Sequence, residues 1–256
     1  MQIVTLTTDF GDQDYYAGAL KGALLYRQPA LNLVDITHRI KPFDIVQGAF
    51  VLQNVWPEFP KGSIHVLAVN CFYDPAFRFV VARKSGHFFL APDNGLLSLL
   101  FGNLPAEDVF ELEKPSGNHF PMKEVFAAAV SHLTEQQPFE DIGSPAGSLP
   151  DRITLQPVIT PTRIRGTVLY IDNFENAVIN LRQDLFEKVS NGRGFSLFFK
   201  RNDPITQLSQ HYCDVPVGEP LCIFNAAGFL EIAINMGKAA SLLGLKPEEV
   251  VEIVFT

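Results

Sequence analysis

The sequence predicts two domains: an α/β domain with a largely parallel sheet over residues 1–150 and an all-β, barrel-like domain over residues 166–256, joined by a linker at 151–165. Three observations support this prediction. Strand and helix patterns alternate through the first half, which is typical of a parallel sheet covered by helices. Prolines and turn residues then interrupt the pattern. Short β-rich segments follow to the end of the sequence.

The first half opens with a strand and continues as a strand–helix alternation. The β-branched run 3–7 ends in Thr-Asp-Phe-Gly, which predicts a strand leading into a loop. In one strong helix pattern, Val125, Ala129 and Leu133 recur at helical spacing, and Pro121 suits the first turn. The other expected strands are 31–36, 63–69, 77–83, 87–92 and 109–112, and the expected helices are 15–27, 45–56, 96–101 and 122–134.

The second half has the pattern of a small antiparallel fold. Residues 144–165 contain four prolines and two turn signals, which predicts a linker or an extended crossover. One short helix is expected at 238–243 among strands that suit a small barrel or sandwich. The expected strands are 166–171, 177–181, 194–200, 221–225, 229–235 and 250–255.

Composition excludes several classes of partner. The net charge is −8 and no stretch concentrates Lys and Arg, so we expect no nucleic-acid partner. The three cysteines form no C-x-x-C pair, which suits a reducing compartment. No signal-peptide pattern opens the sequence and no apolar run reaches the ~18–20 residues that span a bilayer. We therefore expect a cytoplasmic protein with no membrane partner.

Familiar catalytic motifs are absent from the sequence. It contains no G-x-G-x-x-G, P-loop, H-E-x-x-H or G-x-S-x-G pattern. The six histidines never recur at a spacing of four residues. The sequence therefore predicts no metal site, although ligands from distant segments stay open.

Asp9 is the first candidate for a functional residue. It follows the opening strand, and open α/β sheets bind ligands in loops at the carboxyl ends of their strands. An ionised carboxylate there could accept hydrogen bonds from the two hydroxyls of a ribose. The alternative is that Asp9 caps the following helix or turn.

Other polar motifs have plain structural explanations. His38 is expected to be a structural hydrogen-bonding residue, and Asp44 a good N-cap for the helix that follows. Residues 93–95, Asp-Asn-Gly, suit a turn. The run 172–176 can bind an amino-acid zwitterion or simply form a turn. Glu231 lies in an apolar strand, where a buried carboxyl would need a partner.

The order and spacing of these motifs are more specific than any one of them. The sequence resembles the S-adenosylmethionine (SAM) hydroxide adenosyltransferases, the family that also holds the fluorinases and chlorinases. The resemblance extends over essentially the whole chain. It rests on the segments TLTTDFG, DITHRI, FPKGSIHVLAV, APDNGL, SPAG, YIDNFEN and GFLEIAIN.

The resemblance implies a fold, an assembly and a reaction. It implies an α/β domain followed by a β-barrel, and a homotrimer that binds SAM between the N-terminal domain of one subunit and the C-terminal domain of the next. A nucleophile would displace L-methionine from the ribose C5′. No cofactor or metal is implied beyond SAM as the substrate.

The resemblance also assigns residues to the substrate. Asp9 matches the family's ribose-binding Asp, and Phe43, otherwise a core candidate, matches an aromatic ring that packs on the ribose. Asp172 and Asn176 match positions that hold the methionine end. Phe120 matches the Phe of the family's T-F-H-G motif and is also expected at the substrate.

The side of the nucleophile departs from the family pattern. Asn70 replaces the Asp of the hydrolytic members, and an amide cannot orient or deprotonate water as a carboxylate does. Arg78 falls one residue later than the family's Arg. Pro121 stands in the place of the His, while His119 or Asp74 could substitute from nearby. We expect Asn70, Arg78 and His119 around the nucleophile.

Three functions follow from this pattern. The first is an enzyme that cleaves SAM at C5′ with water to adenosine and L-methionine. The second is a module that binds SAM or adenosine without catalysis. The third is a trimeric scaffold that binds no nucleoside.

Overall fold

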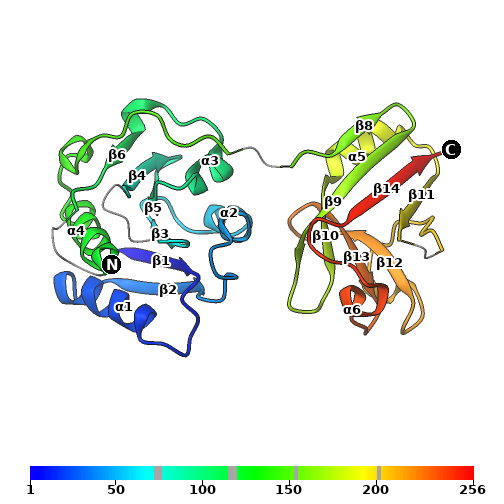
Figure 1. Cartoon of the computed structure of the whole chain (residues 1–256), viewed down its shortest axis with the longest axis horizontal. Coiled ribbons are helices and arrows are strands. Elements are labelled where there is room, and N and C mark those ends of the chain that lie inside the picture. Colours follow the sequence, from blue (N-terminus) through cyan, green and yellow to red (C-terminus); the bar gives the residue numbers. More distant parts are fainter. Residues whose placement is uncertain (72–76, 115–119, 153–154, 201–202) are drawn as a thin grey trace. The chain divides into compact units, whose positions relative to one another are not determined.

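The computed structural model describes residues 1–71, 77–114, 120–152, 155–200 and 203–256. The chain divides into two compact units, Met1–Thr154 and Leu155–Thr256. Figure 1 shows the elements of both units.

The sheet of the first unit is mixed rather than largely parallel. Its strand order is β2-β1-β3-β5-β4-β6-β7. The pairs β1–β2, β1–β3 and β3–β5 are parallel, while β4–β5, β4–β6 and β6–β7 are antiparallel. The strands are β1 (Ile3–Thr8), β2 (Asn32–Thr37), β3 (Ile64–Ala68), β4 (Phe79–Lys84), β5 (His87–Pro92), β6 (Val109–Glu111) and β7 (Ser144–Pro145).

The reversal of β4 corrects the prediction of a largely parallel sheet. Only Ser85 and Gly86 separate β4 from β5, and their φ angles are 53° and 82°. Two central residues with positive φ form the tight turn of an antiparallel hairpin, whereas a parallel connection needs about a dozen residues. The sequence thus carried a signal for the hairpin in its Ser-Gly pair.

Helices cover both faces of this sheet (Figure 1). On one face Leu20 and Leu24 of α1 pack with Phe126 of α4 in one core cluster. On the other face Leu52 of α2 and Leu96 of α3 belong to a second cluster. The helices are α1 (Tyr16–Arg27), α2 (Ile45–Gln53), α3 (Leu96–Phe101) and α4 (Pro121–Thr134), with 3-10 turns η1 (Trp56–Glu58), η2 (Ala106–Asp108) and η3 (Phe139–Asp141).

The second unit is a curled antiparallel sheet that forms a half-barrel. Its order is β11-β14-β9-β10-β13-β12, with β8 beside β9. The helix expected at 238–243 is present as α6, whereas α5 was not predicted from the sequence. The elements are β8 (Val158–Thr160), β9 (Arg163–Ile171), β10 (Ala177–Arg182), α5 (Gln183–Ser190), β11 (Phe195–Phe199), η4 (Tyr212–Asp214), β12 (Pro220–Phe224), β13 (Phe229–Ile234), α6 (Ala239–Leu243) and β14 (Val250–Phe255).

Candidate functional site

Asp9 lies at the topological switch point of the first sheet, where successive strands are added on opposite sides of β1. The chain adds β2 on one side of β1 and then β3 on the other, so a crevice is expected at the carboxyl ends of β1 and β3. Asp9 directly follows β1. Its Oδ2 accepts hydrogen bonds from the backbone amides of Phe43 (2.9 Å) and Asn70 (3.0 Å).

These contacts differ from the cap that was the alternative for Asp9. The carboxylate bonds amides of two remote segments, and α1 begins without a side-chain cap. Within the described part of the chain, Oδ1 of Asp9 accepts no hydrogen bond. One oxygen therefore ties three segments together, and the other has its lone pairs free for a ligand.

Phe43 is an exposed ring on a constrained backbone. Its side chain is 70% exposed and its φ is 69°, a left-handed conformation that is rare for an aromatic residue. The alternative of a core position for Phe43 is therefore wrong. Asp44, the next residue, accepts a hydrogen bond from the Gln47 amide at 2.9 Å, which confirms it as the N-cap of α2.

Asn70 follows β3 in a left-handed conformation with a φ of 53°. Its amide points at Asp9, and Nδ2 of Asn94 donates to the carbonyls of Val69 (3.1 Å) and Asn70 (3.4 Å). Asn94 also accepts from the Leu96 amide at the start of α3. The predicted turn at 93–95 is confirmed, and its Asn holds the Asn70 segment in place.

Arg78 is engaged by two carboxylates. Its guanidinium forms ion pairs with Asp93 and with Glu111, the latter at 3.2 Å, and donates to the Ala146 carbonyl at 2.9 Å. Burial raises the pKa of Asp93, against the opposing charge of Arg78. Sequence reasoning missed this cluster, since no local pattern pairs residues so far apart in the chain.

The remaining nucleophile candidates fall at or beyond the limits of the described chain. His119 and Asp74 lie outside the described residues.

Phe120 is the residue before α4, and its ring meets Phe10 (centroids 6.0 Å apart) and Tyr16 (5.6 Å) edge to face. The ring of Phe120 is thus held in an aromatic cluster next to the β1–α1 loop.

Asp172 closes the turn between β9 and β10. Oδ1 accepts from the amides of Phe174 (2.9 Å) and Asn176 (2.8 Å), and Oδ2 accepts from Nδ2 of Asn176 (3.1 Å). The turn explanation for residues 172–176 is confirmed. Because a carboxylate accepts about four hydrogen bonds, Asp172 keeps the capacity to accept one from a ligand.

A cavity of about 500 Å³ adjoins this turn in the second unit. Most of its lining is apolar, and the rings of Phe174 and Tyr212 stand beside the buried amide of Asn176. Met236 adds an exposed thioether. The lining residues are Asn173, Phe174, Asn176, Tyr212, Ile234, Asn235, Met236, Gly237 and Lys238.

Glu231 is buried, and the expected partners are present. Tyr212 donates its hydroxyl to Oε1 (2.8 Å) and Asn225 donates Nδ2 to Oε2 (3.1 Å). Burial raises the pKa of Glu231, and the negative charge of Asp172 raises it further, against the opposing effect of these two hydrogen bonds. The carboxyl thus fixes Tyr212, which lines the cavity.

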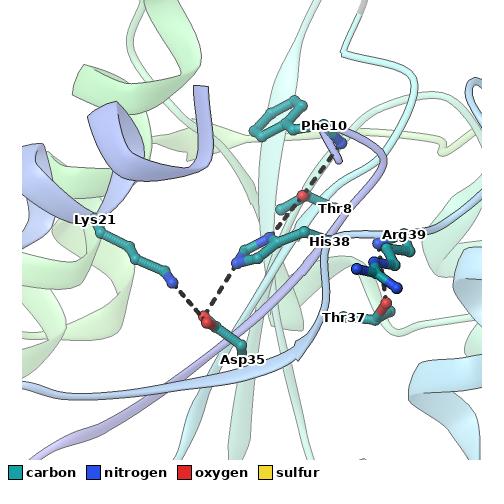
Figure 2. Close-up of polar contacts among 7 residues, drawn as sticks. All are labelled: Thr8, Phe10, Lys21, Asp35, Thr37, His38 and Arg39. Atoms are coloured by element: carbon teal, nitrogen blue, oxygen red, sulfur yellow. Dashed lines mark hydrogen bonds and ion pairs between the residues drawn. The ribbon is translucent and has the colours of Figure 1, made fainter. Parts of the chain in front are cut away.

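Figure 2 shows His38 between the ends of β1 and β2. Its Nδ1 lies 2.9 Å from the hydroxyl of Thr8, and its Nε2 lies 3.1 Å from Oδ1 of Asp35. The second contact has the distance of an ion pair without the direction of a good hydrogen bond. The prediction that His38 is a structural hydrogen-bonding residue is confirmed.

The described residues contain neither a metal-binding cluster nor a membrane-spanning helix. No group of three or more His, Cys, Asp or Glu side chains gathers there in a way that could hold a metal ion. Likewise, none of the described helices has the length and apolar character to cross a bilayer.

The chain matches two family models. The model of the SAM hydroxide adenosyltransferase N-terminal domain matches residues 4–143, and that of the C-terminal domain matches residues 166–252. Together they cover most of both structural units.

Individual proteins are similar over nearly the whole length. The (R)-S-adenosyl-L-methionine hydrolase of Methanocaldococcus jannaschii is 28% identical, with 100% of this chain and 97% of that protein covered. The hydrolase of the same name from Thermus thermophilus is 30% identical, with 96% and 97% covered. An uncharacterised conserved protein of Thermotoga maritima has a structure with a TM-score of 0.87 and 27% identity, with 99% and 100% covered.

Proposed function

This chain belongs to the SAM hydroxide adenosyltransferase family, and on that premise we propose that it cleaves SAM at C5′ with water to give adenosine and L-methionine. The strongest support is the similarity, over nearly the full length, to proteins named (R)-S-adenosyl-L-methionine hydrolase. The free oxygen of Asp9 at the carboxyl end of β1 is the structural observation that carries the proposal.

The reaction needs little beyond positioning. The oxygen of water attacks C5′, the C5′–S bond breaks, and its electron pair goes to sulfur, which leaves as the neutral thioether of methionine. The proton of water passes to solvent. Because the sulfonium is already a good leaving group, the protein has to hold C5′ in line with water and exclude competing solvent.

The ribose is assigned to the first unit. Oδ1 of Asp9 would accept from the ribose hydroxyls, while Oδ2 holds the carboxylate in place through the amides of Phe43 and Asn70. The exposed ring of Phe43 would pack on the sugar, with Phe120 nearby in the aromatic cluster. The burial of these apolar faces would contribute to affinity.

The methionine end is assigned to the second unit. Asp172 and Asn176 would receive its ammonium group, since the carboxylate keeps lone pairs beyond those used in its turn. The cavity beside them has room for part of the ligand.

The nucleophile side is assigned to Asn70, Arg78 and His119. Because Arg78 is already bound by Asp93 and Glu111, we give it an indirect role. It fixes Asp93, and the adjacent Asn94 holds the carbonyl of Asn70. Arg78 would thereby position the segment that faces the water.

The assembly and location are part of the proposal. We propose a homotrimer in which SAM lies between units of neighbouring subunits, with no cofactor besides the substrate. A cytoplasmic location fits the three cysteines, which are all unpaired, including the exposed Cys213.

One observation favours a second candidate function, binding without catalysis. Asn70 provides an amide where the hydrolytic pattern has a carboxylate, and Arg78 is committed to its own ion pairs. A chain that keeps the ribose contacts and lacks the base would bind SAM or adenosine and leave it intact.

The test is to incubate the protein with SAM in ¹⁸O-labelled water and to separate the products by chromatography with mass detection. Labelled adenosine together with methionine supports the hydrolase. Calorimetric binding of SAM without products selects the binding module. Absence of binding to SAM and adenosine contradicts both functions.

The variant Asp9→Asn tests the ribose contact. An amide can still accept from Phe43 and Asn70, but it loses the charge that strengthens hydrogen bonds to the ribose. We expect nucleoside affinity to fall by at least about tenfold, because hydrogen bonds to charged groups contribute about 1.5–3 kcal/mol. Asp14→Asn, at an exposed position in the same loop, is the matched control. Equal affinity of both variants by calorimetry would reject the assignment.

A further inference from the structure

His38 joins the two loops that carry the proposed ribose contacts. It follows β2 directly, and its ring reaches Thr8, the last residue of β1 (Figure 2). The imidazole is 10% exposed and Thr8 is fully buried. The contact between His38 and Thr8 has no part in the proposed binding of ribose, methionine or water.

The protonation of the ring follows from its neighbours. Nε2 lies 3.1 Å from Oδ1 of Asp35. Although this contact is not a directed hydrogen bond, the carboxylate attracts an N–H and repels a ring lone pair, which favours the tautomer with the proton on Nε2. Nδ1 is then an acceptor, and the hydroxyl of Thr8 donates to it. Thr8 Oγ1 in turn accepts from the amide of Phe10 at 3.4 Å.

The far end of this chain is anchored on α1. Lys21 donates to Oδ2 of Asp35 at 2.6 Å. Burial alone would raise the pKa of Asp35, but the hydrogen bond and the positive charge of Lys21 hold it below its usual value. Asp35 therefore stays ionised and keeps the ring oriented toward Thr8.

The same two loops also exchange backbone hydrogen bonds around His38. The amide of Gly11 donates to the His38 carbonyl at 2.7 Å, and the amide of Ile40 donates to the Thr8 carbonyl at 3.3 Å. Asp9 lies between Thr8 and Phe10, and the Phe43 amide reaches it from the other loop. His38 thus lies among the hydrogen bonds that join the loop after β1 to the loop after β2.

We propose that His38 is a positioning residue for the nucleoside site: through its hydrogen bond with Thr8 it fixes the backbone on both sides of Asp9 and so aims the Asp9 carboxylate and the Phe43 ring at the ribose. The proposal rests on the ribose role proposed for Asp9. It predicts that the Nδ1 contact with Thr8 matters more to ligand affinity than the Nε2 contact with Asp35.

Two isosteric variants separate these contacts. His38→Asn keeps an oxygen near the place of Nδ1, and His38→Gln keeps a donor near the place of Nε2 and loses the acceptor for Thr8. By calorimetry with adenosine and SAM, we expect H38Q to lose about tenfold in affinity and H38N to stay within about threefold of wild type, since a buried hydrogen bond contributes about 1 kcal/mol and its unpaired partner adds to the loss.

Variants of Thr8 complete the cycle. Thr8→Val removes the hydroxyl at nearly constant volume and should match H38Q, while Thr8→Ser retains the hydroxyl and should restore affinity. The double variant T8V/H38Q should bind no worse than the weaker single variant, because both remove one shared contact. His132→Gln, on α4 outside the site, is the control for a general loss of histidine.

Amide hydrogen exchange of the free protein gives a readout that needs no ligand. In H38Q we expect faster exchange at the amides of Gly11 and Phe43, with unchanged exchange in the β4–β5 pair. A purely structural role would instead change exchange in both regions together.

The two proposals fail in different ways. If wild type binds nucleoside, but H38N, H38Q and T8V all bind as wild type does and the exchange of Gly11 and Phe43 is unchanged, the role of His38 is overturned. If wild type binds no nucleoside, the ribose role of Asp9 and the proposed function fail, and the positioning role of His38 is overturned with them, whatever the exchange data show.

Discussion

At the scale of the residue, the structure shows that several candidate groups form contacts that hold the fold together. Asp9 was expected either to bind ribose or to cap its own turn. The cap is not formed, and Oδ2 of Asp9 joins Phe43 and Asn70 to the end of β1, while the ribose contact stays a prediction. Sequence could suggest the residue because the motif order is specific. It could not give these partners, since hydrogen bonds to backbone amides leave no trace in side-chain identity.

The three cysteines are predicted to differ in reactivity. Burial raises the pKa of Cys222 to about 12, and burial with the nearby charge of Asp9 raises that of Cys71, whereas Cys213 is exposed. Since the thiolate is the reactive form, an aromatic disulfide reagent at pH 8 should modify Cys213 rapidly and the other two thiols much more slowly. Cys213→Ser should remove the rapid phase. A second rapidly reacting thiol in the folded protein would contradict this assignment.

At the scale of the element, Arg78 connects the ends of β4, β5 and β6. Asp93 follows β5, Glu111 ends β6, and Arg78 precedes β4. The sequence predicted these strands but had no means to predict their cross-link, because long-range ion pairs follow from sheet order. The antiparallel direction of β4 could have been predicted from the sequence, since a two-residue turn excludes a parallel connection.

Arg78→Met should lower stability because it leaves the buried carboxyl of Asp93 without its partner. We expect a loss of about 1–3 kcal/mol in the free energy of unfolding, measured by urea denaturation. The double variant R78M/D93N should recover part of this loss, since it removes both members of the pair. Arg39→Met breaks the exposed pair with Asp12 and should change stability by less than about 0.5 kcal/mol. Equal effects of R78M and R39M would refute a structural role.

The buried pair His65–His87 should make the first unit sensitive to acid. Nε2 of His65 lies 3.1 Å from Nδ1 of His87, and burial followed by the charge of His87 lowers the pKa of His65 to about 3. The unfolded chain takes up this proton near pH 6.5. The contribution of His65 to the free energy of unfolding is therefore complete above pH 6.5. Below pH 6.5 it falls by about 1.4 kcal/mol per pH unit.

Urea midpoints at pH 7.5, 6.5 and 5.5 test this expectation. His65→Gln should flatten the dependence, and His132→Gln should leave it as in wild type. Identical slopes for H65Q and wild type would contradict the assignment. The chosen range lies above the region in which carboxyl groups with ordinary pKa values titrate. Asp93 and Glu231, whose pKa values burial raises, are present in all three proteins and cancel in the comparison.

Helix α5 shows why one element escaped sequence analysis. Its Phe186 and Ser190 are buried four residues apart, which is a helical period, but only two turns of it lie among β-rich segments. Whether so short a segment forms a helix depends on its packing against the sheet rather than on its own sequence pattern.

At the scale of the whole molecule, the chain consists of two units with separate cores. The buried residues of the second unit form their own clusters, and all of its strands pair within it. The change of pattern near residue 155 was visible in the sequence because prolines and shortened strands mark it. The curl of the second sheet could not be predicted from the sequence, since it depends on the twist between strands.

The fragment 155–256 should therefore fold by itself. About 100 residues suffice for a stable core. We expect a far-ultraviolet circular dichroism spectrum typical of β-structure and a cooperative urea transition. A gradual, non-cooperative loss of signal would contradict an autonomous second unit.

The tight turn at Ser85-Gly86 has a consequence for the way the first unit acquires its structure. The β4–β5 hairpin joins neighbours in the sequence, whereas β1 meets β3 only after some sixty residues have been made. Closing a short loop costs less chain entropy than closing a long one, so the hairpin is expected to form early and offer β5 as a template to β3. The carboxyl ends of β1 and β3, where Asp9 and Asn70 meet, would then be among the last parts of the nascent chain to mature.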